Sequence, residues 1–142
     1  KGETVVSYLN GIYKNYGFYY DKLFTKTKKG ANGISEIKKQ IEFLRLNPPK
    51  KIAGVNISKI DDYKKGLSYL KTGKINKLYL PKTNLIIYHL EDNSRISVRP
   101  SGTEPKIKFY INLYSKFNKA FVLNEGSEKL EKKLNEIIKH FN

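Results

Sequence analysis

The sequence predicts an α+β domain in which a four-stranded, mostly antiparallel sheet carries its helices on one face. Apolar residues recur at helical spacing near the start of the chain, before residue 48 and at the end. After residue 50 the spacing changes to the alternation typical of strands. Strands and helices do not alternate regularly along the chain, which disfavours a doubly wound parallel sheet.

Three segments have the apolar stripe of an amphipathic helix. The first covers residues 2–16 and is followed by Gly17, a typical C-terminal stop. The second ends before two consecutive prolines at 48 and 49. The third begins at about Ser127, the predicted N-cap, and reaches the end of the chain. The apolar positions are Val5, Leu9, Ile12, Tyr13 and Tyr16 in the first helix, Ile34, Ile37, Ile41 and Leu44 in the second, and Leu130, Leu134, Ile137, Ile138 and Phe141 in the third.

Alternation of apolar and polar residues predicts the strands. The four that form the expected sheet are residues 51–57, 85–90, 95–99 and 107–113. Gly54 is expected to weaken the first of them. Residues 18–27 alternate between aromatic and polar side chains and are predicted to be extended, whereas residues 61–83 are predicted to be a long irregular connection.

The predicted domain boundary lies at a basic, glycine-containing linker, residues 28–33. Residues 1–29 are interpreted as the last helix of a preceding domain together with the linker, and residues 30–142 as the C-terminal domain. The sequence begins with Lys1 rather than Met, which favours a fragment of a longer protein.

Composition restricts the possible functions. The chain has no cysteine, which excludes disulfides and thiolate chemistry, and its two histidines disfavour a histidine metal cluster. Its apolar runs are shorter than the ~20 residues that span a bilayer, so we expect no membrane partner and a cytoplasmic location. The formal net charge of +15 can indicate binding to nucleic acid, to an anionic membrane or to a small polyanionic ligand, or only a solvated lysine-rich surface. The main alternative function is a nucleic-acid-binding module that uses its sheet and its tyrosines.

The segment between the last two predicted strands has the residue types of a phosphate site. Ser101 and Thr103 offer hydroxyl donors, and Gly102 between them can adopt positive φ and allow an anion to approach the backbone. By strand alternation, Arg99 and Lys108 face away from the core, where a guanidinium can grip two phosphate oxygens and an ammonium adds a second charge. The alternative is a hairpin whose proline, serine and glycine serve the turn alone.

The run Val98–Tyr110, VRPSGTEPKIKFY, resembles the signature of the C-terminal domain of the α-D-phosphohexomutases, the family of phosphoglucomutases, phosphomannomutases and phosphopentomutases. The resemblance extends over most of the chain from Val5, and upstream it is similar to the phosphoglucomutase/phosphopentomutase branch. The upstream matches are Leu44-Arg45, Pro48-Pro49, Ile52 to Gly54, Asp62 to Gly66 and Leu80-Pro81. It implies a fold like that of the TATA-box-binding protein.

The resemblance also implies a function. The domain would bind the phosphate of a hexose or pentose phosphate, or of its bisphosphate intermediate, through Arg99, Ser101, Gly102, Thr103 and Lys108. Mg²⁺ and a phosphoserine would belong to upstream domains of the same enzyme, its other partners. We therefore expect no catalytic residue, no metal ligand and no cofactor in this domain, no activity of the fragment alone, and no nucleic-acid partner.

The remaining candidate residues are interpreted structurally. Asp61 and Asp62 form an adjacent carboxylate pair, and their place in a predicted irregular connection disfavours a magnesium role. His89 lies in a predicted strand and is interpreted as a half-exposed sheet residue rather than a catalytic base.

Overall fold

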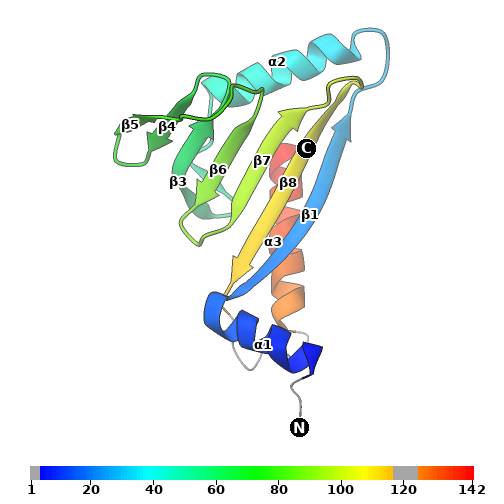
Figure 1. Ribbon diagram of the computed structural model, residues 1–142. Coiled ribbons are helices and arrows are strands. Elements are labelled where there is room, and N and C mark those ends of the chain that lie inside the picture. The colour runs from blue at the N-terminus through cyan, green and yellow to red at the C-terminus, as the bar shows by residue number, and fades with distance from the viewer. Residues whose placement is uncertain (1–3, 117–124) are drawn as a thin grey trace.

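The computed structural model describes residues 4–116 and 125–142, which form one sheet, two helices against one of its faces and a third helix at its end (Figure 1). The helices are α1 (Val5–Tyr16), α2 (Gly33–Leu46) and α3 (Glu125–Phe141). The strands are β1 (Phe18–Thr27), β2 (Lys51–Ile52), β3 (Val55–Asp62), β4 (Leu67–Leu70), β5 (Ile75–Lys77), β6 (Ile86–Leu90), β7 (Arg95–Pro100) and β8 (Lys106–Ser115).

The sheet is larger than predicted. Its strands follow the order β1-β8-β7-β6-β3-β4-β5, β2 pairs with β3, and every pair is antiparallel. The α+β class is confirmed, but the prediction of four strands is wrong because the described residues form a sheet of eight. The prediction that residues 61–83 are irregular is also wrong, since this segment contains the end of β3 and the hairpin β4–β5.

Gly54 has a different role from the one predicted. Ile52 pairs with Val55, and the two residues between them have positive φ, 47° at Ala53 and 74° at Gly54. Two consecutive positive φ angles are the geometry of a tight hairpin turn, which glycine adopts at no steric cost. Gly54 therefore separates two strands instead of weakening one.

The core lies between the sheet and helices α2 and α3. The Tyr88 hydroxyl donates to the Leu44 carbonyl of α2 at 3.1 Å, while its ring lies 6.3 Å from the Phe141 ring of α3. The Phe109 and Phe141 rings are 4.8 Å apart. Both helices therefore cover the same face, as predicted. In α2, Ile37 and Ile41 are buried as expected, but Ile34 is 53% exposed and contributes little to the core.

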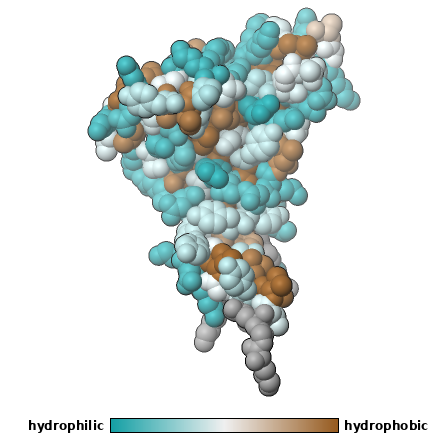
Figure 2. Space-filling view, in the orientation of Figure 1, coloured by the Kyte–Doolittle hydropathy of each residue, from teal (hydrophilic) through white to brown (hydrophobic). Residues whose placement is uncertain are grey.

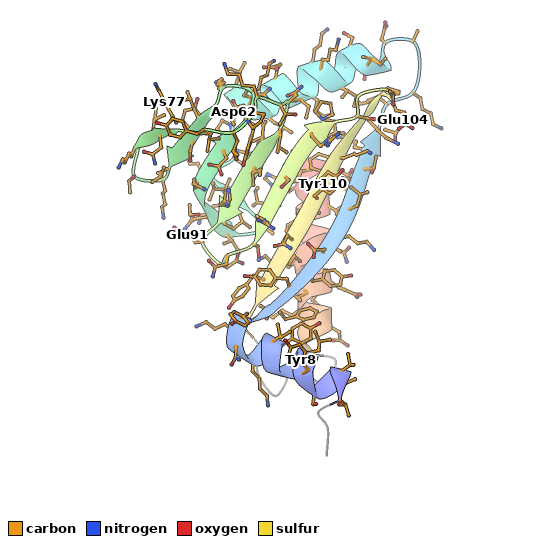
Figure 3. The ribbon with its side chains drawn as sticks, viewed as in Figure 1. Tyr8, Asp62, Lys77, Glu91, Glu104 and Tyr110 are labelled. Carbon is orange, nitrogen blue, oxygen red and sulfur yellow. The ribbon has the colours of Figure 1, made fainter. Side chains whose placement is uncertain are left out.

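The other face of the sheet, called the open face below, carries no helix in the described part of the chain (Figure 1). Its central residue Tyr110 is 41% exposed (Figure 3). Because side chains alternate along a strand, this face also carries Arg95, Ser97 and Arg99 of β7. The sheet thus presents a polar surface opposite its apolar one.

Helix α1 has well-formed ends but buries none of its side chains. The Thr4 side chain caps it by accepting from the Ser7 amide at 3.1 Å. The stop predicted at Gly17 is confirmed: its φ is 85°, its N–H donates to the Tyr13 carbonyl, and a Cβ there would lie 2.3 Å from the Tyr114 ring. Residues 2–3 of the predicted helix lie outside the described residues. Figure 2 shows an apolar patch over α1, where the exposed aliphatic residues are Val5, Val6, Leu9 and Ile12.

Strand β1 and helix α3 test two further predictions. Strand β1 pairs with β8 at ten consecutive positions, so residues 18–27 are part of this sheet. The assignment of residues 1–29 to a preceding domain stays a prediction. Helix α3 already includes Ser127, so the prediction that Ser127 is its N-cap is wrong.

Candidate functional site

The turn between β7 and β8, residues 101–105, is fixed at both ends by strand pairing. Pro100 pairs with Ile107, and the Ser101 amide donates to the Lys106 carbonyl at 2.8 Å. Within the turn, the Lys106 amide donates to the Glu104 carbonyl at 2.8 Å. A short turn between two long paired strands has little freedom, which favours precise placement of a ligand.

A third contact joins this turn to the beginning of α2. The Lys28 amide donates to the Pro105 carbonyl at 2.8 Å. A Cβ at Gly33 would lie 2.9 Å from the Cβ of Pro105, so the close approach requires glycine at this position. The N-terminal end of α2, where the helix dipole is positive, therefore lies at the same end of the sheet as the turn (Figure 1).

Arg99 and Lys108 lie directly opposite each other on β7 and β8. Directly opposed side chains have Cβ atoms about 4.5–5.5 Å apart, and like charges in this arrangement are destabilising. In residues 4–116 and 125–142, neither side chain forms an ion pair or a side-chain hydrogen bond. Because neither charge has an ion-pair partner in those residues, the pair concentrates positive charge on the open face, which an anion would neutralise.

Ser101, Gly102 and Thr103 follow Arg99 at the tip of the turn, where Gly102 and Thr103 are exposed. Gly102 does not use the positive φ that glycine allows. A Cβ at Gly102 would meet no atom within 4 Å among the described residues, so the fold itself does not require glycine there. The open space above Gly102 leaves its backbone accessible to a ligand.

The remaining charges of the turn neutralise each other. The Glu104 carboxylate lies 2.6 Å from the Lys106 ammonium. Hydrogen bonding from Lys106 is the main cause that lowers the pKa of Glu104, and the Lys108 charge and a hydrogen bond from Ser101 add to it. Lys106 is thus paired within the turn. Figure 3 places Glu104 at the extreme end of the sheet.

Thr25 is a neighbour of this site that the sequence analysis did not identify. It lies opposite Lys108 on β1, on the open face, and its side chain is exposed. The row Thr25–Lys108–Arg99 therefore crosses three strands. Alternation in residues 18–27 shows which face Thr25 occupies, but only the pairing of β1 with β8 places it beside Lys108.

Asp61 and Asp62 end strand β3 and do not act together. Both are buried, and their side chains lie on opposite faces because they are consecutive in a strand. Asp62 binds Arg45 of α2, and Asp61 binds Lys59 and His89. Among the described residues, no group of three or more His, Asp or Glu side chains is arranged to hold a metal ion. No helix in that part of the chain is long and apolar enough to cross a membrane.

Comparison with known proteins identifies relatives of the chain. A phosphoglucomutase from Staphylococcus saprophyticus is 40% identical over 113 residues, which are 79% of this chain and 20% of the relative. A phosphoglucomutase from Staphylococcus aureus is 38% identical over the same length and shares. The chain thus spans about a fifth of the length of these curated relatives. The open form of parafusin, a phosphoglucomutase from Paramecium, aligns with a TM-score of 0.44 and 17% identity, over 98% of this chain and 24% of its own.

A protein-family model also matches this chain. Residues 45–116, about half of the chain, match the family model of the phosphoglucomutase/phosphomannomutase C-terminal domain. This range includes β7, β8 and the turn between them. The resemblance inferred from the sequence is confirmed, and the chain belongs to the phosphoglucomutase/phosphomannomutase C-terminal domain family.

Proposed function

We propose that this domain binds the phosphate group of a sugar phosphate at the β7–β8 turn and serves as the C-terminal domain of a phosphosugar mutase. The observation that carries the proposal is the pair Arg99 and Lys108, which has no ion-pair partner among the described residues and lies beside the exposed tip of the turn. The match of residues 45–116 to the mutase domain family supports the same interpretation.

Each side chain has a distinct role in the proposed site. The planar guanidinium of Arg99 grips two phosphate oxygens, and Lys108 adds a point charge without that geometric constraint. The hydroxyls of Ser101 and Thr103 and the accessible backbone at Gly102 donate to the remaining oxygens. Thr25 offers a further hydroxyl beside Lys108.

In the proposed full-length enzyme, this domain holds the phosphate that does not react while transfer occurs elsewhere. Binding energy from a remote group then positions the reacting end of the sugar. Mg²⁺ would supply electrostatic stabilisation of the transferring phosphoryl group, and the phosphoserine would supply that group. We assign both groups to other parts of the longer protein, as the family resemblance implies.

The exposed apolar residues of α1 support a contact with those other parts. Val5 is 83% exposed and Val6 67% exposed, which is unfavourable for apolar side chains in water. Because the curated relatives are about five times as long as the matched segment, we propose that upstream domains of the same polypeptide cover this helix. The cytoplasmic location stays a prediction.

A titration tests the proposed site directly. Adding inorganic phosphate or glucose 1-phosphate to the ¹⁵N-labelled chain should shift the amide resonances of Ser101, Gly102 and Thr103. A dissociation constant in the millimolar range is sufficient, since it corresponds to about −4 kcal/mol and is reasonable for one anion held by part of a site. Absence of shifts in these three amides at saturating phosphate would refute the proposal.

Lys108→Ala should weaken the phosphate titration by a smaller factor than a change of Arg99, because it removes charge but leaves the bidentate donor. Lys22→Ala provides the matched control. Lys22 is an exposed lysine of β1 that pairs with Ile111 and therefore lies on the face opposite Lys108. Equal weakening by both variants would show that the effect reflects net charge rather than a site.

The chain alone should not convert glucose 1-phosphate to glucose 6-phosphate, even with Mg²⁺ and a sugar bisphosphate activator. The physical reason is that the proposed domain binds the non-reacting phosphate and has no assigned nucleophile. A coupled assay with glucose-6-phosphate dehydrogenase measures turnover, and the full-length enzyme is the positive control. Turnover by the purified chain would contradict the proposed division of roles.

A further inference from the structure

Strand order places three basic side chains in one row across the open face, far from the β7–β8 turn. Lys59 of β3 pairs with His89 of β6, and His89 pairs with Arg95 of β7. Asn112 of β8 continues the row beyond Arg95. Since directly opposed side chains have Cβ atoms about 4.5–5.5 Å apart, Lys59 and Arg95 flank the His89 imidazole on both sides.

A hollow of about 570 Å³ lies over this row. Its lining includes Tyr19, Lys59, Leu70, His89, Arg95 and Asn112. The volume is within the range of about 300–1,000 Å³ that is usual for small-molecule sites. Arg95 is four residues from Arg99 on the same strand, or roughly 13 Å, so the hollow is separate from the proposed phosphate turn.

The Asp61 carboxylate contacts two side chains of the row. The Asp61 Oδ2 atom lies 2.8 Å from His89 Nε2 and 3.0 Å from the Lys59 Nζ atom. Burial alone would raise the pKa of Asp61, but hydrogen bonds from Ser68, Lys59 and His89 hold it below its usual value. Ionised Asp61 only accepts, so Nε2 carries a proton and the neutral ring has its lone pair at Nδ1. Asp61 Oδ1 is buried without a hydrogen-bond partner among the described residues.

Arg95 differs from Lys59 because no described residue forms an ion pair with it. It is exposed, and in the described part of the chain its guanidinium forms no ion pair or hydrogen bond. The carboxylate at the end of the row, Asp21, accepts from the Asn112 amide. The Arg95 guanidinium therefore lines a hollow of ligand size, and no described residue uses its N–H donors.

We propose that Lys59, His89 and Arg95 form a second anion-binding site on the open face, for a small organic anion that carries a carboxylate or phosphate group. Arg95 grips two oxygens of the anion, and Lys59, whose ammonium is paired with Asp61, adds a donor from the other side of the hollow. His89, when protonated at Nδ1, donates a third hydrogen bond. This site is independent of the phosphate turn and of the function proposed for it.

Proton uptake by His89 should make anion binding at this site depend on pH. The charged groups that face the ring are Lys59 and Asp61 of β3 and Arg95 of β7. Burial is the main cause that lowers the pKa of His89, the Lys59 charge adds to it, and Asp61 opposes it. A bound anion favours the imidazolium, so the pKa rises on binding, and affinity increases as the pH falls through that range. An increase of about three- to tenfold corresponds to a pKa rise of roughly half to one unit.

Sulfate is a suitable probe because it keeps two negative charges between pH 5.5 and 7.5. Sulfate should shift the backbone amides of His89 and Arg95, with an affinity that is higher at pH 5.5 than at pH 7.5, by up to about tenfold. Arg95→Gln should abolish these shifts but retain those of Ser101 to Thr103, and Arg99→Ala should give the reverse pattern. His89→Gln should retain weak binding without the pH dependence. A parallel acetate titration distinguishes preference for a planar carboxylate from preference for a tetrahedral anion.

Arg95 is exposed, so Arg95→Gln should fold normally, which a thermal melt checks. Sulfate shifts confined to Ser101 to Thr103 would overturn the second site while leaving the phosphate turn intact. Unchanged shifts at His89 in Arg95→Gln, or an unchanged pH dependence in His89→Gln, would also overturn it. Failure of the phosphate turn alone would leave the shifts at Arg95 in place.

Discussion

Replacing Arg99 by alanine is expected to weaken phosphate binding by roughly 10- to 100-fold and to leave the fold intact. Hydrogen bonds to charged groups contribute about 1.5–3 kcal/mol each, and each 1.4 kcal/mol is a factor of ten in affinity. The loss therefore equals about one to two such bonds. Arg99→Lys should bind with intermediate affinity, because it keeps the charge and loses the planar fork.

The stability of Arg99→Ala provides an internal control. Arg99 is exposed, lies opposite Lys108 and has no partner among the described residues, so its removal relieves a like-charge contact. We expect the melting temperature to stay unchanged or to rise slightly. An unchanged phosphate titration, with shifts at the lysines of residues 1–29 instead, would show that the anion binds elsewhere. Reduced stability together with reduced binding would point to a structural role for Arg99.

The part of the fold that could be predicted from sequence is the part in contact with the core. Strands β6, β7 and β8 alternate strictly because their inward residues pack against α2 and α3. The same alternation correctly placed Arg99 and Lys108 on the outward face. Two neighbouring strands joined by a short turn leave few possible registers, so the opposition of these two residues follows from local information.

The strands that were not assigned to the predicted sheet, β1, β4 and β5, have little information of this kind in their sequence. Strand β5 is three residues long and fully exposed, and β4 is four residues long, so burial imposes no clear alternation on them. Strand β1 was expected to be extended, but its pairing with β8 joins segments about ninety residues apart in the sequence. Local pattern carries no information on such a contact.

The row over the second proposed site depends on the same long-range order. Lys59 and Arg95 flank His89 only because β6 lies between β3 and β7. Their alignment also depends on the irregularity at Ser58, where the register of β3 against β6 shifts. A shift of one residue moves a side chain to the opposite face, so the row cannot be inferred without the bulge.

The largest expected loss of stability follows from Arg45→Ala, about 3–5 kcal/mol in the free energy of unfolding. The Arg45 side chain is 2% exposed, and its Nε atom donates to Asp62 Oδ2 at 3.0 Å, while Asp62 is 3% exposed. Its other nitrogens donate to Glu42 and Asn84, both at 2.8 Å. Removing the guanidinium leaves a buried carboxylate with the Lys64 and Lys65 amides as its remaining donors. Figure 3 shows Asp62 beside α2, where this network joins helix and sheet.

A double variant separates the cost of the uncompensated charge from the cost of the lost contacts. Asp62→Asn in the Arg45→Ala background removes the buried charge, so we expect it to recover part of the loss rather than add to it. Lys64→Ala is the control: its ammonium lies 2.6 Å from Glu42, but its side chain is 53% exposed, so the change should cost roughly 0–1 kcal/mol. Urea denaturation followed by circular dichroism measures the free energy of unfolding of the unsubstituted chain and of the three variants. If Arg45→Ala cost no more than Lys64→Ala, or if Asp62→Asn destabilised it further, the buried pair would not be the link that holds α2 to β3.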